Sequence, residues 1–405
     1  MDLFCQYPPM GKECGADESG LKYQNYDIRI IMRNFNIDLM RMVFAFIIVY
    51  AHMGLLKMVP ETIVGALLVF FFVLTGYFTM AGYEKRKDKG TSMGSFLLSK
   101  LMTFLPYLIA AGIVTFVLQT ILQMDYYGYS LSESLITSLL TFFADVSCLD
   151  MFDMPFVMGN VAVWYLSGMM IGLAITYPFV MRYGHSFSKY ASPIIAILCI
   201  AVSLRMTGTL FGPYDDIGGV TKGLLESVGM ICLGYFAYEC ATGIKAVDYT
   251  TFGKTLLTVI ELACYIVSVV MMFSWNTIYT GHLVGHFSRE WYEFLICFLM
   301  FIATVLTCSG MTYLAVDVSE RPILKRISSF FAIGSLALYL SNYYQIYFVG
   351  KMMKSQPFDE KLMLVIAFVG VSFVVVYIGG KLLPIAGRWL RSKMIVVDEK
   401  EDDVA

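Results

Sequence analysis

The sequence is poor in charge. Only 15% of its 405 residues are Asp, Glu, Lys or Arg, against about 25% in an average soluble domain, and 58% are hydrophobic. This scarcity excludes a disordered, coiled-coil or collagen-like chain, and it leaves too little polar surface for a soluble protein of two or three domains. The net charge of −2 also provides no basic field that would attract a nucleic acid.

Several familiar signatures are missing as well. Residues 1–33 contain no short apolar region with a cleavage site, so we expect no signal peptide and a first helix that is retained. The sequence has no phosphate-binding loop, dinucleotide fingerprint or serine-nucleophile elbow. We expect no metal site, because His282 and His286 lack the pattern of a zinc-binding helix. We interpret His185 as a solvated residue among basic neighbours.

Long apolar segments make up most of the chain, and the mean hydropathy is +0.69. A helix needs about 20 mostly apolar residues to cross a bilayer. The segments predict an all-α integral membrane protein, a bundle of about ten transmembrane helices, with tails over 1–33 and 385–405 and a transmembrane domain over 34–384. The expected helices cover 36–56, 62–83, 96–122, 161–181, 193–206, 224–240, 256–275, 291–313, 330–349 and 362–383. A further segment, 131–143, is amphipathic.

The distribution of Lys and Arg predicts the orientation, because cytoplasmic loops are enriched in both residues. We group the tail 1–33 with the loops that follow the even-numbered helices. That side carries 21 of the 29 basic residues and the other side carries 7, with Arg41 inside the first helix. We therefore expect both termini in the cytoplasm.

The longest segment expected outside is 123–160. It contains five acidic residues, three tyrosines close together and no Lys or Arg. Acidic and aromatic side chains together suit contact with hydroxyl-rich ligands such as sugars. An ordinary solvated loop with tyrosines at the membrane interface is the alternative.

The first helix carries two ionisable residues, which are costly in a membrane and often functional. Arg41 and His52 are eleven positions apart, about 1100° at 100° per residue, so both project from one face about 16 Å apart along the axis. Asp38 precedes Arg41 by three positions and can pair with it. Arginine binds phosphate or carboxylate through paired hydrogen bonds, and histidine accepts a proton near neutral pH. Two plainer interpretations stay open: an interfacial arginine that reaches the lipid headgroups, and a histidine that only packs in the bundle.

This pair resembles the first-helix signature of the membrane-bound acyltransferase 3 family. Other segments resemble that family in the expected order over about residues 34–380: Phe71-Phe72-Val73-Leu74-Thr75-Gly76-Tyr77, Lys100 before Pro106-Tyr107, Asn160 before Trp164-Tyr165-Leu166, and Gly334-Ser335 before Tyr339-Leu340. Two positions depart from the pattern. The family's second basic residue in the third helix is Thr103 here, which predicts weaker donor binding. A position that is commonly His is Asn342, which forms hydrogen bonds but does not titrate.

The resemblance implies acyl transfer from cytoplasmic acyl-CoA, with acetyl-CoA expected, to a hydroxyl of a cell-envelope glycan or its lipid-linked precursor, at the inner or plasma membrane. The acyl-CoA would be a substrate, and no cofactor would be bound. Arg41 and Lys100 would hold the donor phosphates, and His52 would act as general base. We expect contacts to the acceptor or the oxyanion from Thr75, Tyr77, Trp164 and Asn342.

Two alternatives remain open from the sequence. An acyl-histidine intermediate fits the residues as well as direct attack does. A multi-pass carrier or flippase for a small polar solute or a lipid-linked sugar is the competing class. Dependence on acyl-CoA separates an enzyme from a carrier.

Overall fold

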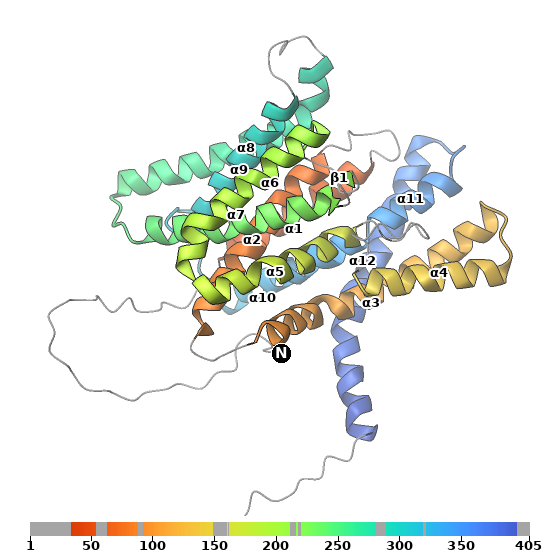
Figure 1. Cartoon of the computed structure of the whole chain (residues 1–405). Helices are drawn as coiled ribbons and strands as arrows, with labels where there is room; N and C mark the ends of the chain where they lie inside the picture. Colours follow the sequence, from red (N-terminus) through yellow and green to blue (C-terminus); the bar gives the residue numbers. More distant parts are fainter. Residues whose placement is uncertain are drawn as a thin grey trace, which may run out of the picture. The chain divides into compact units, whose positions relative to one another are not determined.

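The computed structural model of the chain describes residues 34–53, 63–87, 92–148, 160, 162–210, 216–217, 220–280, 289–318 and 321–394. These residues belong to one unit, which extends from Arg33 to Ala405 (Figure 1). They are largely helical, and β1 (Asp216–Ile217) and β2 (Val220–Thr221) form a short antiparallel ribbon. The tail predicted over 1–33 lies outside the described residues.

The helices follow the predicted segments in order. Their bounds are α1 (Phe35–His52), α2 (Ile63–Glu84), α3 (Met93–Asp125), α4 (Leu131–Val146), α5 (Val163–Tyr183), the π-helical turn η4 (Phe187–Ala191), α6 (Ser192–Thr207), α7 (Lys222–Lys245), α8 (Thr251–Thr280), α9 (Arg289–Ser309), α10 (Pro322–Leu340), α11 (Tyr343–Met352) and α12 (Phe358–Met394). Within the described ranges, ten helical segments are long and apolar enough to cross a membrane. The predicted all-helical fold with about ten such helices is confirmed.

Several helix bounds differ from the predicted segments, and three of the differences bear on the fold. The helix expected over 291–313 ends at Ser309, because Gly310 adopts a φ of 71° in the left-handed region that ends many helices. The short segment at 193–206 is extended by η4, so that one apolar span covers Phe187–Thr207. The segment at 330–349 is interrupted: α10 ends at Leu340 and α11 begins at Tyr343.

Helix α4 occupies the amphipathic segment that precedes α5. It begins with a capping box, in which Ser130 and Glu133 each bond the other's backbone N–H. The hydroxyl and then the backbone N–H of Ser130 hold the pKa of the exposed Glu133 below its usual value. This cap is therefore complete above the usual pKa of a glutamate and weakens as the pH falls through the lowered value.

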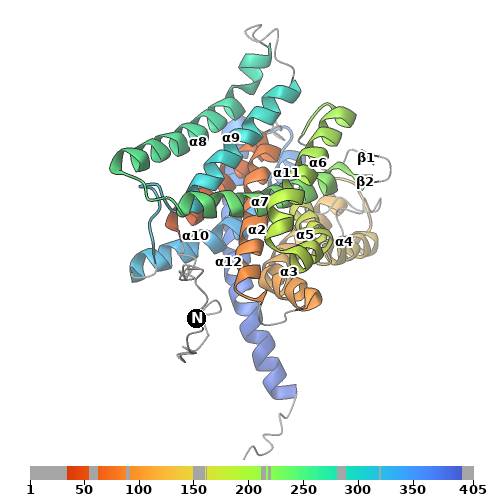
Figure 2. The same ribbon diagram turned by 60° about the vertical axis from the view of Figure 1, so that its left-hand side comes forward.

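Helix α7 packs against α2, α5, α6 and α9 (Figure 2). Its crossing with α2 depends on two glycines that face each other. A Cβ on Gly76 would lie 2.1 Å from the carbonyl oxygen of Ile231, and a Cβ on Gly234 would lie 2.3 Å from that of Val73. No side chain fits at either position, so the two backbones touch as small residues allow in membrane bundles.

We predict that Gly76→Ala and Gly234→Ala destabilise the protein, because an added methyl group forces the two helices apart. Overpacking of this kind costs about 1–3 kcal/mol. Gly243→Ala is the matched control: it lies on α7 with no atom near its Cβ, and alanine favours a helix. Thermal unfolding of purified protein in detergent measures the difference. Equal midpoints for Gly76→Ala and Gly243→Ala would show that the crossing is not tight.

Candidate functional site

Helix α1 positions both predicted ionisable residues. Its first turn is fixed by Asn34, whose side chain accepts a hydrogen bond from the backbone N–H of Asn36. Arg41 lies in the second turn and His52 is the last helical residue. The two therefore lie toward opposite ends of α1, about 16 Å apart along its axis by the rise of a helix.

His52 contacts Asn342, which the sequence analysis placed near the acceptor. The ring Nδ1 lies 2.5 Å from Asn342 Oδ1. The amide nitrogen of Asn342 donates to the carbonyl oxygens of Leu338, at 3.0 Å, and Tyr339, at 2.7 Å. These two bonds fix which end of the amide faces the ring, so the oxygen must accept a proton from Nδ1. The neutral ring then carries its lone pair on Nε2, the atom that can take a proton.

The interruption between α10 and α11 makes this contact possible. Asn342 is fully buried and lies directly after the interruption, where the Ser341 hydroxyl donates to Ala337. Asn160, which precedes α5, holds the same place, because its side-chain nitrogen donates to the Leu340 carbonyl at 2.8 Å. The backbone N–H of Asn160 in turn donates to Asp145 on α4 at 3.2 Å. Contacts from α4 and the start of α5 thus determine where Asn342 meets His52.

Thr75 and Tyr165 form a second group next to this pair. The Thr75 hydroxyl donates to the Phe71 carbonyl at 2.9 Å and lies 3.3 Å from the Tyr165 hydroxyl. The Tyr165 ring packs edge-on against Tyr339, with ring centroids 5.8 Å apart. Tyr165 also lies within range of the Arg41 charge. Through Tyr165, Thr75 is thus linked to Tyr339, whose carbonyl accepts from the Asn342 amide.

Tyr77 and Trp164, also expected near the acceptor, lie elsewhere. The Tyr77 hydroxyl donates to the Cys308 carbonyl on α9 at 3.1 Å. Thr75 and Tyr77 are two positions apart and so project from different faces of α2. Trp164 is buried and packs against Phe72, with ring centroids 6.2 Å apart. The structure does not bring either side chain together with His52.

A cluster of cations lies toward the other end of α1. Arg41 is 3.8 Å from Asp38, the predicted partner, and Asp38 also accepts from the Ser328 hydroxyl. Lys100 Nζ lies 5.6 Å from the centroid of the Phe96 ring. The positive charges of Arg86 and Arg41 both act on the Lys100 ammonium group. We call Arg41, Arg86 and Lys100 the cation cluster.

Arg86 was missed as a site residue because sequence reasoning counted it among the loop charges. Its guanidinium carbon lies 4.9 Å from the same Phe96 ring, and no ion pair to Arg86 or Lys100 occurs among the described residues. Thr103, by contrast, is exposed and its hydroxyl donates to Ser99. Arg86, from the end of α2, and Lys100, from α3, thus lie over the same ring. Like charges held together favour a polyanionic ligand.

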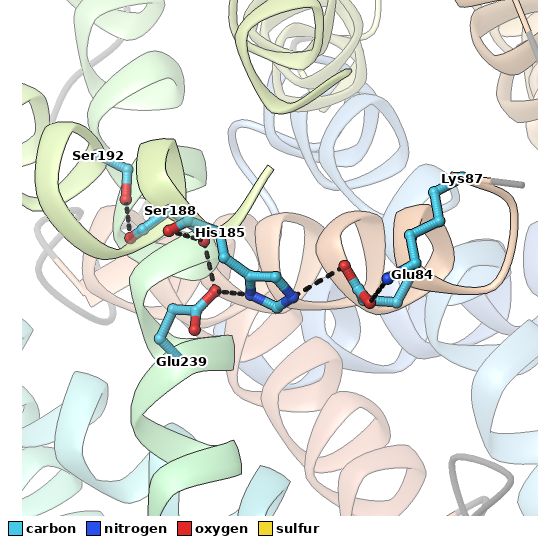
Figure 3. A network of polar contacts seen from close by, with 6 residues as sticks. All are labelled: Glu84, Lys87, His185, Ser188, Ser192 and Glu239. Atoms are coloured by element: carbon cyan, nitrogen blue, oxygen red, sulfur yellow. Dashed lines mark hydrogen bonds and ion pairs between the residues drawn. The ribbon is translucent and has the colours of Figure 1, made fainter. Parts of the chain in front are cut away.

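A hydrogen-bond network that includes Glu84 and Lys87 holds the end of α2 (Figure 3). His185 lies between two carboxylates, with Nε2 3.0 Å from Glu84 and Nδ1 2.8 Å from Glu239 on α7. Both ring nitrogens can donate only in the protonated ring. Ser188 also donates to Glu239, and Lys87 pairs with Glu84 at 3.1 Å. His185 is exposed, as expected for a solvated residue, and its two contacts also tie α2 to α7.

Gln345 is a further residue that sequence reasoning missed. It is fully buried on the first turn of α11, three positions after Asn342, and neither amide atom has a hydrogen-bond partner within the described ranges. In the same ranges, no group of His, Cys, Asp and Glu could hold a metal ion. His282 and His286 lie outside the described residues.

Comparison with known proteins identifies the chain. A family model described as an acyltransferase domain, that of the acyltransferase 3 family, matches residues 34–380, nearly the whole sequence. No curated protein and no solved structure matches the chain. Together with ten membrane-length helices, the match describes a multi-pass membrane protein with acyltransferase activity. The chain belongs to the acyltransferase 3 family.

Proposed function

We propose that the protein is an O-acyltransferase that moves an acyl group, acetyl in the simplest case, from cytoplasmic acyl-CoA to a hydroxyl of an extracytoplasmic or lipid-linked glycan. The main support for this proposal is the contact between His52 and Asn342, which leaves His52 Nε2 unprotonated in the neutral ring. A base of this kind contributes about 10²–10⁴-fold to the rate of a proton-transfer step. The inner or plasma membrane is the proposed location.

The proposed donor site is the cation cluster. The phosphates of acyl-CoA would pair with Arg41, Arg86 and Lys100, and an arginine fork suits phosphate oxygens. The pantetheine arm would then extend along α1 and past Tyr165, so that the thioester approaches His52. The 21 to 7 asymmetry of basic residues supports a cytoplasmic position for this end of the bundle.

In the proposed reaction, the acceptor hydroxyl attacks the thioester carbonyl while His52 Nε2 takes the hydroxyl proton. The carbon–sulfur bond then breaks, the proton passes to the CoA thiolate, and the acyl group remains on the acceptor oxygen. The developing oxyanion needs hydrogen-bond donors. Tyr165 is the proposed donor: its hydroxyl lies 3.3 Å from that of Thr75, whose own proton is donated to the Phe71 carbonyl.

We predict that both termini and the cation cluster lie in the cytoplasm. Reporter fusions after Lys89 should read inside, and fusions after Tyr127 should read outside. The opposite pair of readings would contradict the orientation and would put the donor site on the wrong side of the membrane.

We predict that His52→Ala lowers acyl transfer by about 10²–10⁴-fold while acyl-CoA binding is retained, because the general base is lost. Asn342→Leu should lower the rate less, since the ring remains but its tautomer is no longer fixed. Tyr50→Phe, at an exposed position on the same helix, is the control and should leave the rate unchanged. Turnover of labelled acetyl-CoA, in variants that elute as the wild type does on gel filtration, measures this. Wild-type transfer by His52→Ala would refute the mechanism and favour a carrier.

We predict that Arg41→Ala and Arg86→Gln each weaken acyl-CoA binding by about 1.5–3 kcal/mol, the range of a hydrogen bond to a charged group. Arg41→Lys should restore only part of the loss, because a point charge replaces the fork. Lys85→Gln, exposed beside Arg86, is the matched control. Binding of acetyl-CoA and of its 3′-dephospho form distinguishes phosphate contacts from general destabilisation. If Arg86→Gln and Lys85→Gln bind acetyl-CoA equally, Arg86 has no part in the site.

A further inference from the structure

The interface between α3 and α4 is lined with polar side chains, which we call the polar seam. Helix α3 contributes Thr115, Gln119 and Gln123. Helix α4 contributes Ser134, Ser138, Thr141 and Asp145. Each of the seven is at most 7% exposed. Their spacing of three or four positions places each set on one face of its helix. The two helices lie side by side (Figure 1).

The outer surface of α4 has the reverse character. Leu135, Ile136, Leu139 and Phe143 are exposed, while the polar residues face α3. A helix on the surface of a soluble domain buries its apolar face and exposes its polar one. Helix α4 therefore presents apolar side chains outward, as suits contact with lipid, and reserves its polar side chains for the seam.

Most oxygens in the seam lack the hydrogen bonds that buried polar atoms normally make. Gln119 donates to Thr141 at 3.0 Å, and Thr141 donates back to the Thr137 carbonyl. Five other oxygens have no partner among the described residues, and they belong to Thr115, Gln119, Gln123, Ser134 and Ser138. Elsewhere in the bundle, hydroxyls such as those of Thr120 and Ser268 bond the carbonyl four positions earlier. The seam thus offers free hydrogen-bonding atoms that helix packing alone does not require.

The seam leads toward the proposed catalytic histidine. Asp145 lies at its deep end, where α4 finishes, and accepts from the Asn160 backbone. Asn160 bonds the Leu340 carbonyl, two residues before Asn342. At the other end, Tyr126, Tyr127 and Tyr129 are exposed in the turn between α3 and α4. Aromatic rings of this kind combine apolar area with a polar tip.

The chemistry of the seam specifies the ligand class. Its groups are amides and hydroxyls, which donate and accept hydrogen bonds, and its one ionisable group is Asp145. No Lys or Arg occurs between 123 and 160. Lys351 lies at the end of the seam near the turn between α3 and α4, over the rings of Tyr126 and Tyr347. A neutral polyhydroxylated molecule therefore fits the interior better than a phosphate or a carboxylate does.

We propose that the polar seam between α3 and α4 binds the neutral, hydroxyl-rich part of the acceptor and guides it to His52. The proposal rests on the proposed function, because only a transferase needs an acceptor. It adds a location and a ligand class: an uncharged sugar or sugar alcohol enters past the exposed tyrosines, and its hydroxyls satisfy the five free oxygens.

Cysteine labelling of the full-length protein in lipid nanodiscs tests the seam without using activity. Ser134→Cys and Ser138→Cys replace a hydroxyl with a thiol of similar size. Leu122→Cys is the matched control, because Leu122 is equally buried on α3 but packs in an apolar cluster. A hydrophilic methanethiosulfonate reagent reacts with a thiolate, which forms in water. Mass spectrometry of the labelled peptides separates these positions from the native cysteines.

We expect the two seam cysteines to react at least about tenfold faster than Leu122→Cys, since thiolate formation depends on water. Glucose or sorbitol should slow the reaction, and glucuronate should slow it less because Asp145 repels an anion. Seam cysteines that react no faster than Leu122→Cys would show dry helix packing and overturn the proposal. Fast labelling that neutral sugars do not slow would show a water path only and would overturn it equally.

Acyl-CoA turnover, measured in parallel, keeps the two ideas distinct. If the wild type does not consume acetyl-CoA but glucose protects the seam cysteines, the proposed function fails and the binding site stands. If acetyl-CoA is consumed and protection is absent, the acceptor does not use the seam.

Discussion

The hydrogen bond between His52 and Asn342 joins the end of α1 to the interruption between α10 and α11. It constrains several elements at once. An uninterrupted helix would give Asn342 different backbone partners, and the ring of His52 would face another group. Asn160, just before α5, and Asp145, on α4, secure the interruption. Since unpaired polar groups are costly in a membrane, each member of this chain of contacts depends on the others being in place.

The two ends of the bundle differ in chemistry. Arg41, Arg86 and Lys100 gather positive charge where one ring, Phe96, lies beneath two of them. The polar seam has no cation and, apart from Asp145, offers uncharged hydroxyl and amide groups. A charged donor and a neutral acceptor would therefore be sorted by electrostatics before they meet. His52 and Asn342 connect to the seam through Asn160 and Asp145, the side from which the proposed acceptor would approach.

Much of the fold could be predicted from the sequence, because long apolar segments have few alternatives to a membrane helix. Hydropathy also located the amphipathic segment that became α4. It could not reveal the interruption at Ser341 and Asn342, since both residues sit inside a continuous apolar window and the break depends on partners distant in the chain. The end of α9 depends on the left-handed conformation of Gly310, which cannot be predicted from hydropathy.

The candidate site was predictable only in part. The shared face of Arg41 and His52 follows from helix geometry within a single segment. Asn342 was chosen by resemblance, and only the fold could show that its amide faces His52. Arg86 and His185 were interpreted as loop residues. Sequence position does not reveal that Arg86 lies over Phe96, or that His185 lies between Glu84 and Glu239. Tyr77 and Trp164 were grouped with Thr75 by motif, yet helix periodicity and packing separate them.

The tautomer of His52 shows whether Asn342 fixes Nδ1 as the proton donor and leaves Nε2 as the base. The chain has four histidines, so nitrogen-15 NMR of histidine-labelled protein in nanodiscs can resolve this ring, with His52→Gln as the assignment variant. Neutral His52 should carry its proton on Nδ1, and Asn342→Leu should abolish this preference. A proton on Nε2 in the wild type, or an unchanged spectrum in Asn342→Leu, would contradict it.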